Sequence, residues 1–243
     1  MTTERKKVLV TGASKGIGRA VLRRLADDGY RAVGLARSRP DDLRTDEEFH
    51  TIDLTDLAAT KALVKDLAAE GPFYGLVNNA AMSPTTSMDD TSLKDMNDSI
   101  TLNLNAPLVC TQAVVDGMRK LGDGRIVNLS SRAALGKINR TAYSAAKAGI
   151  IGMSRTWALE LAEHGITVNV IAPGPVATEL FHSASPPGHP RTEALLAAVP
   201  LRRVAEPLEI AHAVAFLMDS RAGFMTGQTL HIDGGLTVSA VRI

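Results

Sequence analysis

The chain has 243 residues, of which 45% are hydrophobic, and this composition suits one α/β domain spanning residues 1–243. Its formal net charge of +1 provides no overall attraction to nucleic acid or to an anionic membrane. One cysteine excludes an internal disulfide, and the chain shows neither a signal-like N-terminus nor an apolar run of 18 residues, so we expect a cytoplasmic protein without a membrane span.

Short β-branched runs alternate with longer amphipathic segments along the chain. The predicted strands are residues 7–11, 31–36, 49–52, 74–78, 125–129, 166–171 and 229–232. The predicted helices are residues 16–28, 55–69, one or two within 92–120, 141–164 and 206–219. This alternation predicts right-handed crossovers and a doubly wound parallel sheet, a three-layer Rossmann fold that binds ligands at the carboxyl ends of its strands.

A glycine-rich loop, TGASKGIG at residues 11–18, joins the first predicted strand to the first predicted helix. Glycines let a phosphate approach the backbone, and the start of a helix offers unpaired N–H donors. The spacing differs from the usual G-x-G-x-x-G dinucleotide fingerprint, and glycine is common in strand-to-helix turns. Because the loop is the first βα turn, we nevertheless expect it to bind a nucleotide. The expected contacts are Gly12, Ser14, Lys15, Gly16, Ile17 and Gly18.

The end of the second predicted strand bears on the choice of cofactor. An NAD-specific site usually places an acid about 20 residues beyond the glycine loop, whereas this strand ends in Ala36 followed by Arg37. A guanidinium binds phosphate through two hydrogen bonds, and Lys15 adds a second cation, so we expect NADP(H) to be favoured over NAD(H). Alternatively, Arg37 and Arg39 are solvated charges, and the aspartates at 41–42 turn back toward a ribose.

The run TAYSAAKAGI, residues 141–150, places Tyr143 and Lys147 one helical turn apart on the same face. Reduction of a ketone requires a proton donor, and a phenol with a pKa near ~10 is a poor one at pH 7. A neighbouring ammonium favours the phenolate and lowers that pKa, so Lys147 is expected to tune Tyr143. The alternative is a half-buried aromatic residue beside a solvated lysine.

Several motifs in this order resemble those of the classical short-chain dehydrogenase/reductase family, from about residue 6 to residue 235. Within that family the chain looks most like the 3-oxoacyl-[acyl-carrier-protein] reductase branch. The motifs that carry the resemblance are TGASKGIG at 11–18, NNA at 78–80, a serine after the fifth strand, Y-x-x-x-K at 143–147 and PGPVAT at 173–178.

Two positions depart from the family pattern. Ala81 follows NNA, where the family usually has glycine. Ser131 precedes Tyr143 by one residue fewer than the commonest family spacing, which Ser130 would restore. Alignment on GRIVNLSS places Ser131 at the catalytic position, and Ser130 is then an ordinary serine at a strand end.

The resemblance implies a catalytic set of four residues, Asn103, Ser131, Tyr143 and Lys147. Tyr143 would exchange the proton, while Ser131 would bond the substrate oxygen where charge develops. Lys147 would also bond the nicotinamide ribose. Asn103 would take part with Lys147 in a proton relay mediated by water. The alternative for Asn103 is a buried amide that bonds to helix backbone.

The resemblance also implies further cofactor contacts. Asp53 would meet the adenine beside the Leu54 backbone, unless Asp53 is a helix cap, a role that Thr55 could fill. Thr178 would contact the nicotinamide carboxamide, unless it only caps a following helix. The other implied contacts are Asn79 and Ala80 at the adenosine ribose, and Pro173, Gly174 and Val176 on the nicotinamide side.

These observations predict an NADP(H)-linked carbonyl reductase or alcohol dehydrogenase acting on a small-molecule substrate. The alternatives are a non-catalytic dinucleotide-binding regulatory module and a methyltransferase on a similar sheet. A complete set of four catalytic residues argues against the regulatory module. Only His182 and His189 lie close together among the six histidines, with no acid or cysteine at ligand spacing, so no metal site is expected.

Three further expectations concern the substrate side and the assembly. Residues 178–201, with a centre rich in Pro, Gly and Ser, are predicted to be a mobile substrate lid rather than a surface excursion. The sequence does not identify the substrate. An anionic group on it would be favoured by three basic residues, Arg132, Lys137 and Arg140, unless these are solvated surface charges. Small and apolar residues within 100–120 and 143–163, together with the family resemblance, lead us to expect a homotetramer.

Overall fold

The computed structural model of the protein describes residues 5–186 and 188–238. The predicted domain of residues 1–243 includes residues 1–4 and 239–243, and the predicted lid includes Pro187, and these lie outside the described residues. Within the described ranges, no helix is both long enough and apolar enough to cross a membrane.

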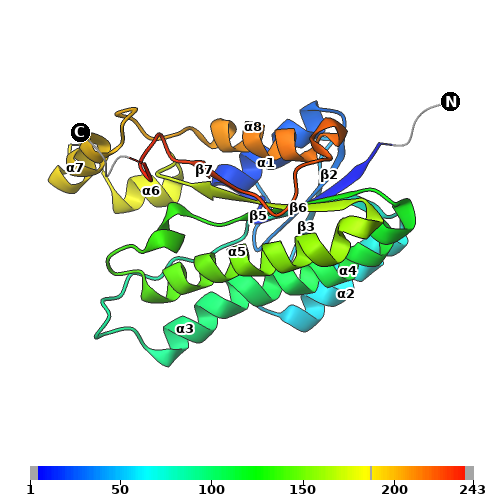
Figure 1. The fold of residues 1–243 in the computed structure, drawn as a ribbon, viewed down its shortest axis with the longest axis horizontal. Coiled ribbons are helices and arrows are strands. Elements are labelled where there is room, and N and C mark those ends of the chain that lie inside the picture. The colour runs from blue at the N-terminus through cyan, green and yellow to red at the C-terminus, as the bar shows by residue number, and fades with distance from the viewer. Residues whose placement is uncertain (1–4, 187, 239–243) are drawn as a thin grey trace.

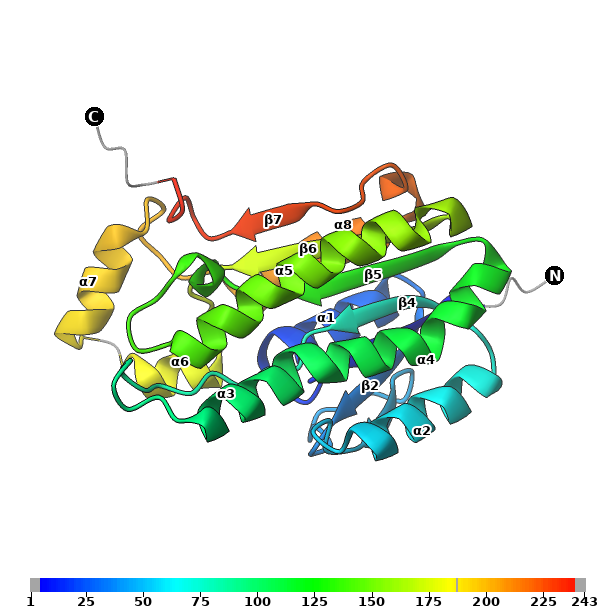
Figure 2. The same cartoon turned by 60° about the horizontal axis from the view of Figure 1, so that its bottom comes forward.

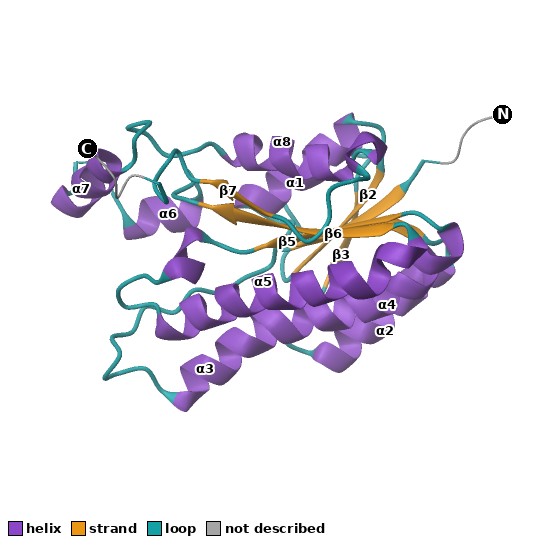
Figure 3. Ribbon diagram, viewed as in Figure 1, coloured by secondary structure: helices purple, strands orange, loops and turns teal. Residues whose placement is uncertain are grey.

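A seven-stranded sheet forms the centre of the molecule, with every neighbouring pair of strands parallel (Figures 1 and 3). The strands lie in the order β3-β2-β1-β4-β5-β6-β7, so the chain changes direction across the sheet between β1 and β4. This order confirms the predicted doubly wound fold and places a crevice at the switch point. The strands are β1 Lys7–Thr11, β2 Arg31–Ala36, β3 Glu48–Thr51, β4 Phe73–Asn78, β5 Gly124–Leu129, β6 Ile166–Pro173 and β7 Thr229–Ile232.

Helices cover both faces of this sheet. Helices α1 and α8 pack on one face and α2, α4 and α5 on the other, while α6 and α7 lie at the end toward which the strands point (Figures 1 and 2). The helices are α1 Gly16–Asp27, α2 Leu57–Ala69, α3 Leu93–Ile100, α4 Ala106–Leu121, α5 Thr141–Leu161, α6 Glu179–Ala184, α7 Pro190–Ala198 and α8 Pro207–Met218. Short helical turns complete the chain: η1 Thr101–Asn105, η2 Arg132–Leu135, η3 Ala162–His164 and η4 Ser220–Ala222.

The apolar strands are explained by the two layers that they support. Along β1, Val8 and Val10 belong to the buried cluster beneath α1 and α8, whereas Leu9 belongs to the cluster beneath α2, α4 and α5. Alternate residues of a strand point to opposite faces, so a sheet covered on both faces needs apolar residues at every position.

The observed helices differ from their predicted limits, mostly by one to three residues at an end. Helix α2 begins at Leu57 because the Asp56 side chain accepts a hydrogen bond from the Ala59 amide at 2.9 Å, so neither Asp53 nor Thr55 is the cap. The region 92–120 consists of α3 and α4 joined by the π-helical turn η1. The predicted lid, residues 178–201, contains two short helices, α6 and α7.

Candidate active site

A cleft of about 950 Å³ opens at the carboxyl ends of the strands near the β1–β4 switch point. Its walls come from the glycine loop, the segments that follow β2, β3 and β4, helices α3 and η1, and the start of α6. The predicted cofactor residues that line it are Gly12, Ser14, Lys15, Gly16, Ile17, Gly18, Arg37, Asp53, Leu54, Asn79, Ala80 and Thr178.

The glycine loop leaves no room for side chains at two of its positions. A Cβ on Gly18 would lie 2.2 Å from the Gly12 carbonyl oxygen, and one on Gly12 would lie 2.8 Å from the Ala80 Cα. Gly12 also has φ +67°, which disfavours residues with a Cβ. The Asn79 side chain donates to the carbonyl oxygens of Thr11 at 2.9 Å and Gly12 at 3.2 Å, and so holds the loop against the end of β4.

The start of α1 fits a dinucleotide pyrophosphate. No side chain caps the helix at Lys15, so the N–H groups of its first turn are left to an external acceptor. The glycines beside them allow that acceptor to approach the backbone closely. Free N–H donors and a backbone without side chains are what the pyrophosphate of the predicted nicotinamide cofactor requires.

The charged side chains that line the cleft have both signs: Lys15 and Arg37 are basic, and Asp53, Asp98 and Glu179 are acidic. Arg37 lines the cleft and is exposed, and among the described residues its charge acts on Asp53 without an ion pair between them. Lys15 is 67% exposed and its Nζ lies 3.4 Å from an oxygen of Glu179, the first residue of α6. Of the two aspartates considered as ribose ligands, Asp42 is instead paired with Arg19 at 2.8 Å.

Asp53 faces the same cleft and is held by its own turn. One carboxylate oxygen accepts hydrogen bonds from the Thr55 amide at 3.0 Å and the Thr55 hydroxyl at 2.8 Å. These bonds, first the amide and then the hydroxyl, lower the pKa of Asp53, and the nearby charge of Arg37 lowers it further. Asp53 is therefore an anion with a fixed orientation at the cleft wall.

Thr178 both caps a helix and lines the cleft, which are the two alternatives that the sequence left open. Its hydroxyl oxygen accepts a hydrogen bond from the Phe181 amide at 3.2 Å and so caps α6. The same residue lines the cleft, and its methyl carbon would lie 3.1 Å from a Cβ placed on Gly16. The start of α6 is thereby placed directly opposite the glycine loop.

The Tyr143–Lys147 pair lies on α5, where the lysine is almost completely buried. Lys147 is 3% exposed, its Nζ donates to the Leu129 carbonyl at 2.7 Å, and it lies 5.7 Å from the centre of the Tyr143 ring. Burial lowers the pKa of Lys147 to about 7, because an ammonium loses its hydration there. Lys147 is therefore not the solvated lysine of the alternative interpretation.

The pKa of Tyr143 moves in the opposite direction to the expected one. Burial raises it, while a hydrogen bond with Ser131 and the charge of Arg140 act to lower it. Lys147 is not among the groups that shift the pKa of Tyr143, and its Nζ donates to the Leu129 carbonyl. The phenol therefore carries its proton at neutral pH.

The two adjacent serines differ in their partners. Ser130 is buried and donates to the Lys147 carbonyl oxygen at 2.6 Å, so its hydroxyl is used in joining β5 to α5. Ser131 caps η2 by accepting from the Ala133 amide at 3.1 Å, and it is the serine whose hydroxyl acts to lower the pKa of Tyr143. The hydroxyl beside the phenol thus belongs to Ser131.

Asn103 lies in the π-helical turn η1 between α3 and α4. Its Nδ2 donates to the carbonyl oxygens of Ser99 at 2.9 Å and Met82 at 3.1 Å, as expected of a buried amide that satisfies backbone. Its Oδ1 is buried and has no hydrogen-bond partner within the part of the chain described. A buried acceptor of this kind normally has a partner, so the amide retains one acceptor for another molecule.

Some predicted contacts do not line the cleft. Pro173 pairs with Ile232 at the end of β6, Gly174 donates to the Ile232 carbonyl at 3.0 Å, and Val176 packs in the buried cluster beneath α1 and α8. The four predicted catalytic residues also lie beyond the lining, although Asn103 directly follows the lining residue Leu102 and bonds to Met82, another one.

Sequence reasoning missed ten lining residues. Most adjoin a predicted motif and could have been found by extending it, whereas Asp98 and Thr101 carried no signal because their place depends on how α3 and η1 pass the cleft. The missed residues are Ala36, Ser38, Ile52, Thr55, Ala81, Met82, Asp98, Thr101, Leu102 and Glu179. Across the described residues, no three His, Cys, Asp or Glu side chains are grouped so as to hold a metal ion.

Comparison with known proteins gives matches over almost the whole chain. The family model described as Enoyl-(Acyl carrier protein) reductase matches residues 12–237. The chain is similar to the 3-oxoacyl-[acyl-carrier-protein] reductase FabG of Escherichia coli (strain K12), with 37% identity over 97% of this chain and 99% of the relative.

Solved structures agree with this placement. The ligand-free aldohexose dehydrogenase of Thermoplasma acidophilum is 30% identical, with a TM-score of 0.90 over 97% of this chain and 95% of that one. ElxO with NADP bound is 28% identical, with a TM-score of 0.90 over 97% of this chain and 100% of that one.

Proposed function

Because this chain belongs to the short-chain dehydrogenase/reductase family and is an NAD(P)-dependent oxidoreductase, we propose that it reduces the ketone of a 3-oxoacyl thioester with NADPH. The observation that carries the proposal is the pairing of Tyr143 with buried Lys147 on α5, where the Lys147 Nζ lies 5.7 Å from the centre of the Tyr143 ring, in a chain whose glycine loop lines a cleft and leaves helix N–H groups for a phosphate. Family membership excludes the methyltransferase alternative, and nothing favours a non-catalytic regulatory module.

The raised pKa of Tyr143 suits the reductive direction. When bound, the nicotinamide supplies the hydride to the carbonyl carbon. Tyr143, protonated at neutral pH, donates its proton to the carbonyl oxygen. The Ser131 hydroxyl, which acts on the same phenol, is proposed to hold the carbonyl oxygen while negative charge develops on it.

Lys147 and Asn103 are proposed to return a proton to Tyr143. A lysine with a pKa of about 7 exchanges a proton readily near neutral pH. The unpartnered Oδ1 of Asn103 offers an acceptor for a bridging water. Lys147 would also bond the nicotinamide ribose, in exchange for its present bond to the Leu129 carbonyl.

Arg37 supports a preference for NADP(H) over NAD(H). Its guanidinium is exposed at the cleft, with no carboxylate bonded to it among the described residues, and can pair with a ribose phosphate. Lys15 adds a second cation, although Glu179 competes for it. Pro173, Gly174 and Val176, at and after the end of β6, are proposed to contact the nicotinamide side of the cofactor.

Residues 178–201 are proposed as the substrate lid, since Thr178 and Glu179 at their start already line the cleft. We also propose a cytoplasmic homotetramer. Leu159 on α5 supports an interface because it is 84% exposed, and the single buried cysteine, Cys110, suits a reducing compartment.

The test combines Tyr143→Phe with a matched pair of serine variants. Tyr143→Phe should bind NADPH like the unmodified protein, measured by nucleotide fluorescence, while turnover of a 3-oxoacyl thioester falls about 10²–10⁴-fold. Ser131→Ala should also lose turnover. Ser130→Ala should lower the melting temperature but keep turnover, because its hydroxyl bonds only the Lys147 backbone. Near-normal turnover by Tyr143→Phe would contradict the mechanism.

A further inference from the structure

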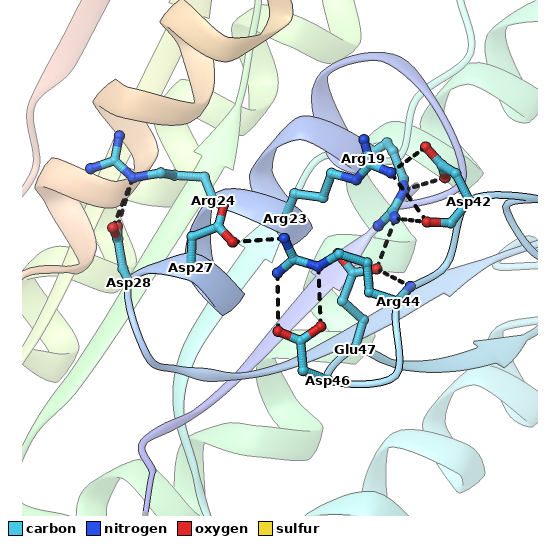
Figure 4. A network of polar contacts seen from close by, with 9 residues as sticks. All are labelled: Arg19, Arg23, Arg24, Asp27, Asp28, Asp42, Arg44, Asp46 and Glu47. Carbon is cyan, nitrogen blue, oxygen red and sulfur yellow. Dashed lines mark hydrogen bonds and ion pairs between the residues drawn. The ribbon is translucent and has the colours of Figure 1, made fainter.

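A buried arginine joins α1 to the segment between β2 and β3 (Figure 4). Arg19 directly follows the last glycine of the cofactor loop, and its side chain is only 8% exposed. Its Nη2 lies 2.7 Å from an oxygen of Glu47, whose side chain is fully buried. Neither charge would be retained here without its partner, because an unpaired buried ion is strongly destabilising.

The same arginine holds Asp42. Its Nε donates to Oδ1 of Asp42 at 2.8 Å, and its Nη2 donates to the Asp42 carbonyl oxygen at 2.8 Å. Arg23, one turn later on α1, lies 2.6 Å from the other carboxylate oxygen of Asp42. The bond from Arg19 holds the pKa of Asp42 below its usual range. Asp42 is therefore an anion turned toward α1.

Glu47 extends the network along its own segment. Its Oε2 accepts the Arg44 amide at 2.9 Å, and the Arg44 guanidinium reaches Asp27 at the end of α1 at 2.7 Å. The segment from residue 38 to residue 47 is thus fastened to both ends of α1, as Figure 4 shows.

This segment begins directly after Arg37, which lines the cofactor cleft. Helix α1 begins at the glycine loop, which lines another wall of the same cleft. Arg19 therefore ties together two phosphate-binding elements. It also occupies Asp42, an acid close to Arg37 in the chain that would otherwise repel a ribose phosphate.

We propose that Arg19 is a positioning residue for cofactor selection: by binding Asp42 and Glu47 it presents Arg37 to the cleft and withholds the Asp42 carboxylate from it. The ligand recognised is the phosphate ester on the adenosine ribose, which distinguishes NADPH from NADH. The inference rests on the proposed NADP(H) preference. It adds that this preference depends on the network and not on Arg37 alone.

The principal test is Arg19→Lys, which keeps the charge but cannot reproduce three directed hydrogen bonds. Dissociation constants for NADPH and NADH are measured by fluorescence at one fixed ionic strength. The NADPH to NADH selectivity should fall about tenfold, chiefly through weaker NADPH binding, because a loosened segment must be ordered on binding. Backbone amides of residues 38–47 should exchange hydrogen faster in the protein without cofactor.

Two further variants separate positioning from simple charge and from stability. Asp42→Ala removes a negative charge, so a pure field effect would tighten NADPH binding, whereas loss of positioning lowers the selectivity. Asp28→Ala is the matched control, since it breaks the Arg24–Asp28 pair at the far end of α1 without touching the segment. Its melting temperature can fall, but its selectivity should stay unchanged.

The outcomes separate this inference from the proposed function. Equal affinities for NADPH and NADH in the unmodified protein would overturn the NADP(H) preference, and the inference with it. A second set of results would overturn the inference alone. In it the unmodified protein prefers NADPH, but Arg19→Lys keeps the same selectivity or Asp42→Ala binds NADPH more tightly. Lower selectivity in both variants and not in Asp28→Ala would support it.

Discussion

Replacement of the buried lysine by methionine should change how the stability of the protein depends on pH. Lys147 is 3% exposed, and burial lowers its pKa from an ordinary 10.5 to about 7. Between these two values the unfolded chain holds the proton and the folded protein does not. The unfolded state therefore binds more protons, and stability rises with pH across this window.

The magnitude follows from the difference between the two pKa values. A fall from 10.5 to about 7 corresponds to about 5 kcal/mol, which is the cost of the charged form in the folded protein below pH 7. Integration from pH 7 to pH 9 returns about 2 kcal/mol of this to the unmodified protein. Methionine has a similar length and no charge, so Lys147→Met lacks this contribution.

Urea unfolding at several pH values between 7 and 9, without cofactor and at one protein concentration, measures the effect. The free energy of unfolding of the unmodified protein, relative to Lys147→Met, should rise by about 2 kcal/mol over this range. Lys61→Met, at an exposed position on α2, is the control and should give a profile parallel to that of the unmodified protein. Parallel profiles for the unmodified protein and Lys147→Met would show that the lysine is not buried as described, and would refute the reasoning.

The other predictions concern the cleft, the lid and the assembly. Gly18→Ala should abolish NADPH binding measured by fluorescence, because its Cβ would lie 2.2 Å from the Gly12 carbonyl oxygen; unchanged binding would mean that the loop is not so arranged. Arg37→Asp should reverse or erase the preference for NADPH, as measured by the two dissociation constants, and an unaltered ratio would exclude Arg37 as a phosphate ligand. Hydrogen exchange within residues 178–201 should slow when cofactor and substrate bind, and unchanged exchange would count against a lid. Light scattering at micromolar concentration should give the mass of a tetramer, and a monomer would reject the proposed assembly.

The fold could be predicted because its signals are local. The five central strands β2, β1, β4, β5 and β6 are short and mostly apolar runs, as a sheet covered on both faces requires, and strands alternate with helical segments along most of the chain. Finer limits depended on individual hydrogen bonds. Asp56 caps α2 through the Ala59 amide, and η1 interrupts what the sequence alone shows as one or two helices.

Parts of the candidate site could also be predicted from the chain. The position of TGASKGIG after the first strand indicated the phosphate-binding turn, and the spacing of Tyr143 and Lys147 placed them on one helical face. These inferences need only the geometry of a strand, a turn or a helix. Choosing Ser131 over Ser130 required a family resemblance, because neighbouring serines are alike until their partners are known.

Burial and long-range pairing were decided by the tertiary structure alone. The sequence predicted that an ammonium would lower the pKa of Tyr143, whereas burial raises it and Lys147 bonds the Leu129 carbonyl instead. The sequence likewise presented Arg19 and Glu47 as ordinary charges, and folding buries them together 2.7 Å apart. The free energy of an ionised group depends on its hydration and on partners distant in the chain, and both are set only when the elements pack.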